Sequence, residues 1–327
     1  MGEFDLIERF FTRPAQAGYT AAVAVGIGDD CAILQPSPGM QLAISSDMLV
    51  AGRHFFTDTD PARLGHKALA VNLSDLAACG AEPLGFTLAL ALETIEARWL
   101  QAFSGGMLAL AGQHHCPLVG GDTTKGPMTI NITVFGQLPQ GQALLRSGAR
   151  PGDDLYVSGT IGEARAGLAL LRGEWTLADA ALRQHLCQRL EAPTPRLALG
   201  QRLRGIASAA MDLSDGLRGD LGHILKASGV GAHIDGVAVL ATSPALWQAL
   251  AAWPAQRQIA FALAGGDDYE LLFTAAPAER AAIAAIGAAL AVPVQRIGRI
   301  VAGHGITVVD GDGQPVPLDL PSFDHFG

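Results

Sequence analysis

Residues 144–159, LLRSGARPGDDLYVSG, form the clearest break in the chain and decide how its fold is divided. Glycine, proline and a pair of aspartates separate two strand-like runs, which is typical of a domain boundary or a long turn. With 327 residues the chain is long enough for two domains of ordinary size. We therefore expect one domain over residues 1–150 and a second over residues 151–327.

On the N-terminal side of the break, hydrophobic periodicity predicts a mixture of helices and strands. Asp60 is a good helix N-cap and Pro61 suits the first helical turn, so a helix begins there and ends near Gly80. The other predicted helices are residues 4–11 and 96–115, and the predicted strands are residues 31–35, 40–47, 85–92 and 129–138.

On the C-terminal side, residues 154–159 lead through a turn into a helix over residues 163–171. An alanine-rich helix is predicted over residues 277–290, before a pair of strands at residues 294–301 and 306–313. The fold class is therefore two domains of α/β or α+β type, while periodicity leaves the strand order in each sheet open.

Composition and charge narrow the classes of function. The formal net charge is −9 and the pI is near 5.4, which disfavours binding to nucleic acid or to an anionic membrane surface. Mean hydropathy is +0.28, but the most apolar stretch, Leu84–Leu92, is far shorter than the roughly 20 residues of a membrane span. The N-terminus carries early acids and no signal-like segment.

Four widely spaced cysteines form no CxxC pair, which is typical of free thiols in a reducing compartment. We therefore expect a cytoplasmic protein. The cysteines are Cys31, Cys79, Cys116 and Cys187.

Aspartates recur beside Gly or Ser at the ends of apolar runs. Each one alone is common turn or cap chemistry, but six such stretches would repel one another unless they shared cations. Carboxylates with Ser and Thr hydroxyls favour Mg²⁺ or Mn²⁺ over zinc. The stretches are Gly28–Asp30, Ser45–Asp47, Asn72–Asp75, Gly120–Thr124, Asp212–Gly216 and Gly265–Glu270.

Familiar nucleotide-binding motifs are absent from the sequence. GGDTTKGP lacks P-loop spacing, and Cys31 stands where a dinucleotide-binding GxGxxG would need its third glycine. No HRD or DFG triplet of protein kinases and no GxSxG elbow occurs. If the chain handles ATP, it therefore uses a different scheme, in which metal ions supply the positive charge.

An ordered set of motifs resembles the thiamine-monophosphate kinase family, within the superfamily of aminoimidazole ribonucleotide synthetase. The set runs from about residue 3 to the C-terminus and reads GIGDDCA, SSDMLVAGRHF, KALAVNLSDLAACGAEP, GGDTT, LLRSGARPGD, MDLSDGL and GGDDYELLFT. The resemblance implies an N-terminal α/β domain that dimerises through its strands, a C-terminal α/β domain, and ATP bound near the dimer interface. The expected assembly is a homodimer.

The resemblance also implies roles for individual residues. Several Mg²⁺ ions would be held by Asp30, Ser45, Ser46, Asp47, Asp75, Asp122, Asp212 and Asp215. ATP would contact Gly121, Asp122, Arg146 and Ser214, and substrate would contact His54, Asp267 and Phe323. Asp267 stands where the family more often has Glu, so its substrate contact would be shorter or mediated by water.

The implied reaction transfers the γ-phosphoryl group of ATP to thiamine monophosphate, giving thiamine diphosphate and ADP. The acceptor is a phosphate monoester with a second pKa of about 6, so it is already a dianion at pH 7 and needs no general base. In-line positioning and relief of repulsion between two polyanions are what the site must supply.

Rival functions lie within and outside the superfamily. No lysine precedes Lys67, which argues against the function of a selenophosphate synthetase. The chain ends in PSFDHFG and lacks the C-terminal cysteine of the hydrogenase-maturation enzyme, which argues against that function. Aminoimidazole ribonucleotide synthetase stays a formal competitor. A non-catalytic regulator would have lost metal ligands, whereas all six aspartates are present. A metal-free protein with acidic turns predicts ATP binding that does not depend on Mg²⁺.

Overall fold

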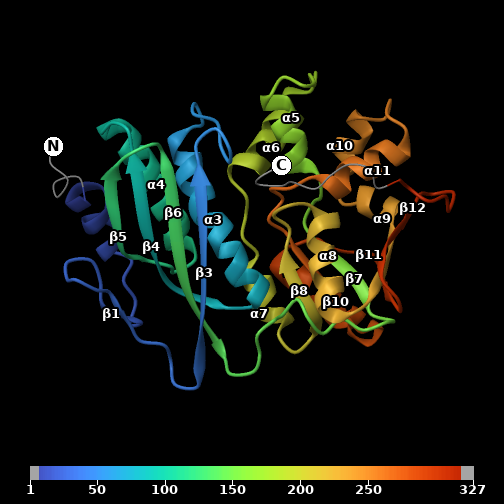
Figure 1. Ribbon diagram of the computed structural model, residues 1–327, viewed down its shortest axis with the longest axis horizontal. Helices are drawn as coiled ribbons and strands as arrows, with labels where there is room; N and C mark the ends of the chain where they lie inside the picture. The colour runs from blue at the N-terminus through green and yellow to red at the C-terminus, as the bar shows by residue number, and fades with distance from the viewer. Residues whose placement is uncertain (1–6, 318–327) are drawn as a thin grey trace. The chain divides into compact units, whose positions relative to one another are not determined.

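The computed structural model describes residues 7–317, which divide into two compact units. The first unit comprises Met1–Leu76 and Ala81–Ala143, and the second comprises Ala77–Gly80 and Leu144–Gly327. Figure 1 shows that each unit has its own sheet and its own helices. The expected two-domain mixture of helices and strands is confirmed.

The first unit is built on a four-stranded sheet of order β3-β6-β4-β5. β3 pairs antiparallel with β6, β6 pairs antiparallel with β4, and β4 pairs parallel with β5. A small antiparallel pair, β1 and β2, precedes it. The strands are β1 (Val23–Val25), β2 (Ile33–Leu34), β3 (Met40–Val50), β4 (Glu82–Leu92), β5 (Leu118–Lys125) and β6 (Thr129–Pro139).

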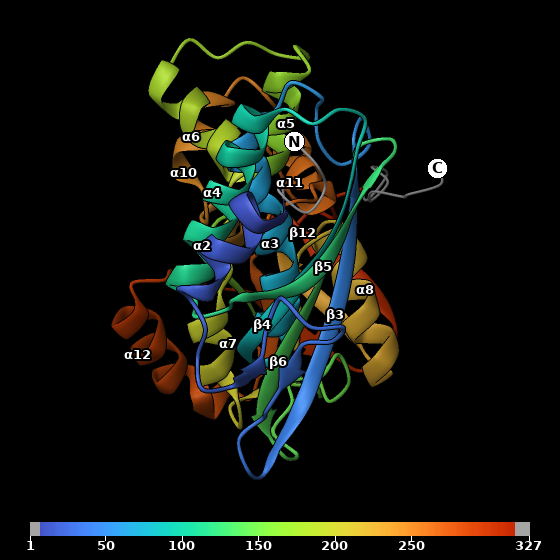
Figure 2. The same cartoon turned by 90° about the vertical axis from the view of Figure 1, so that its left-hand side faces the viewer.

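Helices cover one face of this sheet, as Figure 2 shows for α3 and α4. They bury Leu88, Ile132 and neighbouring apolar side chains. The opposite face of β3 carries large exposed apolar side chains: Leu42, Ile44 and Met48 are 52%, 61% and 56% exposed. The helical elements of the unit are η1 (Glu8–Thr12), α2 (Arg13–Gln16), α3 (Pro61–Cys79) and α4 (Ala97–Gln113).

Helix α3 begins after Asp60 and ends before Gly80, as the capping residues predicted. The Asp60 carboxylate accepts the backbone N–H of Arg63 at 3.0 Å, which caps the first turn. Gly80 follows the helix with φ of 71°, and the N–H of Ala81 reaches back to the carbonyl of Leu76 at 2.8 Å. This is the left-handed C-terminal stop that glycine adopts without strain.

The second unit holds a six-stranded sheet of order β12-β9-β11-β7-β10-β8. All neighbouring strands are antiparallel except β9 and β12, which are parallel. Its central strands are buried, and one large apolar core links the sheet to the surrounding helices. The strands are β7 (Asp154–Ser158), β8 (Ala207–Asp212), β9 (Gly231–Asp235), β10 (Leu271–Ala275), β11 (Val294–Val301) and β12 (Gly305–Val309).

The helices of the second unit include the two predicted from sequence. The helix expected over residues 163–171 is α5, and the alanine-rich segment begins with one 3₁₀ turn before α12. The helical elements are α5 (Glu163–Leu171), α6 (Ala180–Glu191), α7 (Leu197–Leu203), α8 (Leu217–Ser228), α9 (Gly236–Leu240), α10 (Pro244–Ala249), α11 (Ala255–Ala264), η2 (Pro277–Glu279) and α12 (Arg280–Leu290). Within residues 7–317, no helix is both long and apolar enough to cross a membrane.

Candidate active site

In the first unit, α3 presents two polar side chains to the edge strand β3. The Ser45 hydroxyl donates to the Asp75 carboxylate at 2.5 Å, and the backbone N–H of Asp47 donates to the Asn72 amide oxygen at 3.0 Å. Residues three apart on a helix share a face, as do residues two apart on a strand, so the two contacts form side by side. Asn72 is buried, and its amide oxygen gives the backbone N–H of Asp47 a partner that an edge strand would otherwise lack.

This part of the unit suits a hard cation. Ser45 and Asp47 lie on the same face of β3, and Asp75 meets that face from α3. Mg²⁺ prefers such oxygen donors and usually takes only one or two carboxylates from the protein together with substrate phosphates. Ser46 alternates to the other face, where its hydroxyl lies 3.0 Å from that of Thr133. The structure therefore does not bring the two serine hydroxyls together.

Asp122 lies on β5, a strand that the periodicity did not predict. The register places Asp122 beside Ala89, which pairs with Asn131 and through it with Met48. Asp122 is thus three strands from β3, or roughly 14 Å at the usual strand spacing. Gly121 has φ of 148°, and a Cβ there would lie 1.9 Å from the Leu88 carbonyl oxygen. Only glycine allows this close approach.

Asp30 and His54 lie in loops of the same unit. Asp30 is exposed, and its backbone N–H donates to the Asp29 carboxylate at 2.8 Å. The His54 Nδ1 accepts the backbone N–H of Val50 at 3.0 Å, so in the neutral ring the hydrogen sits on Nε2. That tautomer can donate to a phosphate oxygen from Nε2, which suits a positioning role better than that of a general base.

The second unit joins two of the predicted motifs. Asp267 donates its backbone N–H to the Ser214 carbonyl at 2.8 Å, and Tyr269 does the same to Leu213 at 2.8 Å. Two backbone hydrogen bonds therefore join the loop after β8 to the loop before β10, and they place Ser214 next to Asp267. Asp212 ends β8, where it pairs with Leu271.

Asp220 organises the loop after β8 from within α8. Its buried carboxylate accepts the backbone N–H groups of Asp215 and Gly216, both at 3.1 Å. Burial, and then the charge of Asp215, raise the pKa of Asp220 to about 7. Arg146 lies on an exposed segment whose backbone is fastened to the end of α8, because the Ser228 hydroxyl donates to the Arg146 carbonyl at 3.2 Å.

The loop Gly265–Glu270 has an unusual backbone. Asp267 and Tyr269 have φ of 67° and 49°, the left-handed region that non-glycine residues rarely adopt. The alternate residues, Asp268 and Glu270, are buried at 1% and 0% exposure. Such strain persists only where the surroundings hold it, and here the two buried carboxylates supply the anchors.

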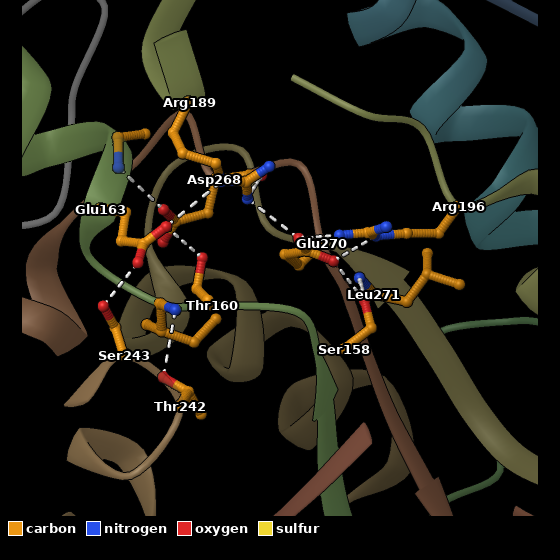
Figure 3. A network of polar contacts seen from close by, with 12 residues as sticks. Ser158, Thr160, Glu163, Arg189, Arg196, Thr242, Ser243, Asp268, Glu270 and Leu271 are labelled. Carbon is orange, nitrogen blue, oxygen red and sulfur yellow. Dashed lines mark hydrogen bonds and ion pairs between the residues drawn. The ribbon is translucent and has the colours of Figure 1, made fainter. Parts of the chain in front are cut away.

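Figure 3 shows the network that holds these anchors. Glu270 accepts two hydrogen bonds from Arg196, both at 2.6 Å, one from Arg189 at 2.9 Å and one from the Ser158 hydroxyl at 2.6 Å. Gly159 packs so closely that a Cβ there would lie 2.0 Å from Glu270 Oε1. A carboxylate held by two arginines and a hydroxyl is fully satisfied despite its burial.

Asp268 anchors the same loop to the start of α5. Its carboxylate accepts the backbone N–H groups of Gly162 at 2.9 Å and Ala164 at 3.3 Å, and Arg189 donates to its carbonyl at 3.2 Å. A carboxylate at a helix N-terminus satisfies N–H groups that have no partner within the helix.

Glu163, in the first turn of α5, completes the network. It accepts from Thr160 at 2.7 Å, Ser243 at 2.5 Å and His185 at 2.9 Å. Burial raises the pKa of Glu163, but these hydrogen bonds outweigh it and leave that pKa below its ordinary value.

Asp268 is expected to make folding stability depend on pH. Burial raises its pKa from 3.8 to about 8, against the opposing effect of the Gly162 N–H and Arg189. The folded protein therefore holds this proton more tightly than the unfolded chain, and stability falls as pH rises from about 4 through about 8. When the pH is raised from 6 to 7, the free energy of unfolding of the wild type should fall by on the order of 1 kcal/mol more than that of Asp268→Asn. Urea unfolding at both pH values measures this, and equal losses in the two proteins would contradict it.

The predicted metal ligands come from both units, four acids from the first and two from the second. Among residues 7–317, no three Asp, Glu, His or Cys side chains lie close enough to hold one ion together. Phe323 lies outside the described residues. Sequence reasoning assigned no role to four anchoring side chains, although each stands within five residues of Asp75, Asp215 or Asp267. They are Asn72, Asp220, Asp268 and Glu270, of which only Asp220 lies outside the six aspartate-containing stretches.

Comparisons with known proteins find similar proteins over nearly the whole length of the chain. Residues 28–138 match the model of the AIR synthase related protein N-terminal domain, and residues 150–311 match that of the C-terminal domain. A thiamine-monophosphate kinase from Salmonella typhimurium strain LT2 is 48% identical over 99% of this chain and 98% of its own length.

Two solved structures are similar over nearly the full length. The crystal structure of thiamine-monophosphate kinase from Stenotrophomonas maltophilia K279a has a TM-score of 0.82 and 43% identity, covering 96% of this chain and 98% of that one. AaThiL complexed with AMPPCP and TMP has a TM-score of 0.75 and 30% identity, covering 99% of this chain and 97% of that one.

Proposed function

Because the chain belongs to the thiamine-monophosphate kinase family of AIR synthase related proteins, we propose that it phosphorylates thiamine monophosphate with ATP. The products are thiamine diphosphate and ADP. The observation that carries the proposal is 48% identity to a kinase of this name over 99% of the chain. The AaThiL complex with AMPPCP and TMP adds a related fold that takes a nucleotide analogue and this acceptor together.

The chemistry is a direct in-line displacement. A phosphate oxygen of thiamine monophosphate attacks the γ-phosphorus of ATP, a new P–O bond forms, and the bond from the γ-phosphorus to the β,γ-bridging oxygen breaks. The acceptor is a dianion at pH 7, so no side chain has to remove a proton. The protein has to position the two reactants and neutralise their charges. His54 donates from Nε2 to the acceptor phosphate in this proposal.

Magnesium ions fit the oxygen donors of the site. Asp47, Asp75 and Ser45 would hold Mg²⁺ in the first unit, and Asp212 with Asp215 in the second. The proposed set also includes Asp30, Asp122 and Ser46, the last through its backbone carbonyl. When bound, Mg²⁺ supplies the positive charge that this acidic site needs to accept polyphosphate.

The remaining roles follow the two domains predicted from the sequence. Residues 1–150 would bind ATP and Mg²⁺ and form the dimer, while residues 151–327 would complete the nucleotide and substrate sites. ATP would contact Gly121, Asp122, Arg146 and Ser214, and substrate would contact His54, Asp267 and Phe323. The adjacency of Ser214 and Asp267 supports placing nucleotide and acceptor side by side. We place the enzyme in the cytoplasm.

Phosphorus NMR tests the proposed reaction directly. The purified protein, ATP, Mg²⁺ and thiamine monophosphate should yield thiamine diphosphate and ADP in equal amounts, and chelation of Mg²⁺ should stop the reaction. Intact ATP in the presence of folded protein would overturn the proposal. Turnover with formylglycinamidine ribonucleotide would then indicate the aminoimidazole ribonucleotide synthetase reaction.

The exposed apolar residues of β3 support a homodimer. Leu42, Ile44 and Met48 alternate along one strand and share the face that α3 and α4 do not cover. Contiguous apolar surface of this kind marks an interface. A second copy of the chain is the proposed partner, in line with dimerisation through strands.

The double variant Ile44→Lys with Met48→Lys should therefore be monomeric. Two buried ammonium groups without partners would cost far more than the lost apolar contact. Light scattering should give about twice 33.8 kDa for the wild type and 33.8 kDa for the variant. Ile95→Lys, at a side chain that is 51% exposed in the turn after β4, is the matched control and should stay dimeric. A monomeric wild type would refute the proposal.

A further inference from the structure

Tyr19 lies outside every motif described so far, yet its side chain contacts the first of them. Its hydroxyl oxygen accepts the backbone N–H of Ile27 at 2.8 Å, eight residues further along the chain. Ile27 belongs to the 26–32 loop, GIGDDCA, which carries the proposed Mg²⁺ ligand Asp30. A side chain from the preceding segment therefore holds the backbone of this loop close to a proposed ligand.

The 26–32 loop joins β1, labelled in Figure 1, to β2. The pairing of Val25 with Ile33 closes its base. Gly28 has φ of 129°, and a Cβ on it would meet no atom within 4 Å, so the tip of the loop stands in open space. Asp30, just beyond Gly28, is exposed. The bond from Ile27 to Tyr19 thus adds a contact beyond the base, on the side from which the chain approaches the tip.

Gly26 shows how closely the Tyr19 ring lies against the loop. A Cβ on Gly26 would lie 2.2 Å from Cε2, Cζ and Oη of Tyr19. Gly26 is not among the glycines with positive φ, so its backbone conformation is open to other residues. The ring, and not the backbone, is therefore what requires glycine at position 26.

Tyr19 is itself supported by the helical elements before it. Phe10 of η1 and Ala15 of α2 are buried, and η1 contacts α4. The backbone N–H of Tyr19 donates to the Gln16 carbonyl at 3.3 Å, which forms a turn directly after α2. The hydroxyl that holds Ile27 therefore belongs to a segment anchored in the core of the first unit.

We propose that Tyr19 is a positioning residue for Mg²⁺ binding at Asp30, an inference that rests on the proposed function. An exposed loop that takes up a cation has to be ordered as the cation binds, and this ordering costs part of the affinity. Tyr19 holds Ile27, three residues before Asp30, before metal and nucleotide arrive. The Asp30 carboxylate is then presented from a loop that is already in place.

Tyr19→Phe removes the hydroxyl and keeps the ring. The Mg²⁺ concentration at half-maximal rate should rise about threefold to tenfold, as expected for one lost hydrogen bond, while KM for thiamine monophosphate stays nearly unchanged. Binding of Mn²⁺ in the presence of the nucleotide analogue AMPPCP, followed by electron paramagnetic resonance, gives a reading without turnover. At least one bound Mn²⁺ should be weakened by a similar factor.

Tyr156→Phe is the matched control for this variant. It removes a tyrosine hydroxyl that lies 3.4 Å from the Asp154 carboxylate in the second unit. Neither the Mg²⁺ dependence of the rate nor the affinity for Mn²⁺ should change.

Gly26→Ala tests the same contact from the loop. The new Cβ would displace the Tyr19 ring, so the half-maximal Mg²⁺ concentration should rise at least as much as in Tyr19→Phe. In a Tyr19→Ala background the ring is absent, and adding Gly26→Ala should have little further effect. Equal effects of Gly26→Ala in the two backgrounds would overturn the inference.

A folded Tyr19→Phe with the wild-type Mg²⁺ dependence and Mn²⁺ affinity would also overturn it. A purely structural role for Tyr19 predicts that result, with a lower melting temperature as the sole change. If the wild type made no thiamine diphosphate, the proposed function would fail. Binding of Mn²⁺ with AMPPCP to the wild type and to Tyr19→Phe would then decide the role of Tyr19 separately, since equal affinities would refute it.

Discussion

Asp75→Ala is expected to lower kcat about 100-fold or more at saturating ATP and thiamine monophosphate. Asp75 brings a carboxylate from α3 to the face of β3 that carries Ser45 and Asp47. Removing it takes away a proposed Mg²⁺ ligand. Without Mg²⁺, the acidic side chains of the site would repel the two polyanions. Asp122→Ala should act in the same direction. Steady-state rates at rising Mg²⁺ measure both effects, and the activity that is left should need more Mg²⁺.

The matched control is Glu93→Ala, which removes an exposed carboxylate from the turn after β4 in the same unit. It should keep the wild-type rate and the wild-type Mg²⁺ dependence. Thermal unfolding of all three variants checks that the fold is intact. A near wild-type rate in Asp75→Ala or Asp122→Ala would refute the metal-site proposal, even if the kinase activity itself were established.

Arg196→Met should lower the free energy of unfolding by about 3 kcal/mol. Arg196 makes both of its 2.6 Å hydrogen bonds to Glu270, whose side chain is completely buried. Without Arg196, Glu270 keeps Arg189 and Ser158, but a buried charge loses its bidentate partner. The loss should also loosen the strained loop at Asp267, so KM for thiamine monophosphate should rise while KM for ATP changes little.

Arg172→Met is the control for that variant. Arg172 lies 3.7 Å from Glu174, and both side chains are 53% exposed, so this pair should contribute only about 0–1 kcal/mol. Urea unfolding of both variants makes the comparison. Similar losses in the two would mean that the Glu270 network does not hold the loop in the way proposed.

Local signals predicted part of the fold, whereas β1, β8, β9, β10 and the helices α6 to α11 were not predicted. The helix over residues 163–171 and the strand over residues 294–301 have their predicted bounds, because periodicity and the flanking turns agree there. The first helix extends beyond its predicted end at residue 11, since η1 and α2 together span Glu8–Gln16, and residues 4–6 of the prediction lie outside the description. β5 escaped prediction because Gly120 and Gly121 interrupt it, and glycines weaken any strand pattern.

The site depends on contacts that no local pattern carries. Asp268 and Glu270 read as ordinary turn acids because their partners Arg189 and Arg196 lie 74 to 81 residues away in sequence. Ser45 and Ser46 stand together in the motif, yet strand alternation sends their hydroxyls to opposite faces. A motif therefore names candidate ligands, and the backbone decides which of them face the same side.

The final turn of α3 limits how this protein can be cut into pieces. Ala77–Gly80 belong to the second compact unit, although α3, which ends at Cys79, begins in the first. Gly200 of α7 packs against that turn so tightly that a Cβ would lie 1.9 Å from the Ala77 carbonyl oxygen. A fragment that starts at residue 144 would lack the surface on which Gly200 rests. Gene fusions, domain swaps and split-protein designs should therefore carry residues 61–80 along with the C-terminal portion.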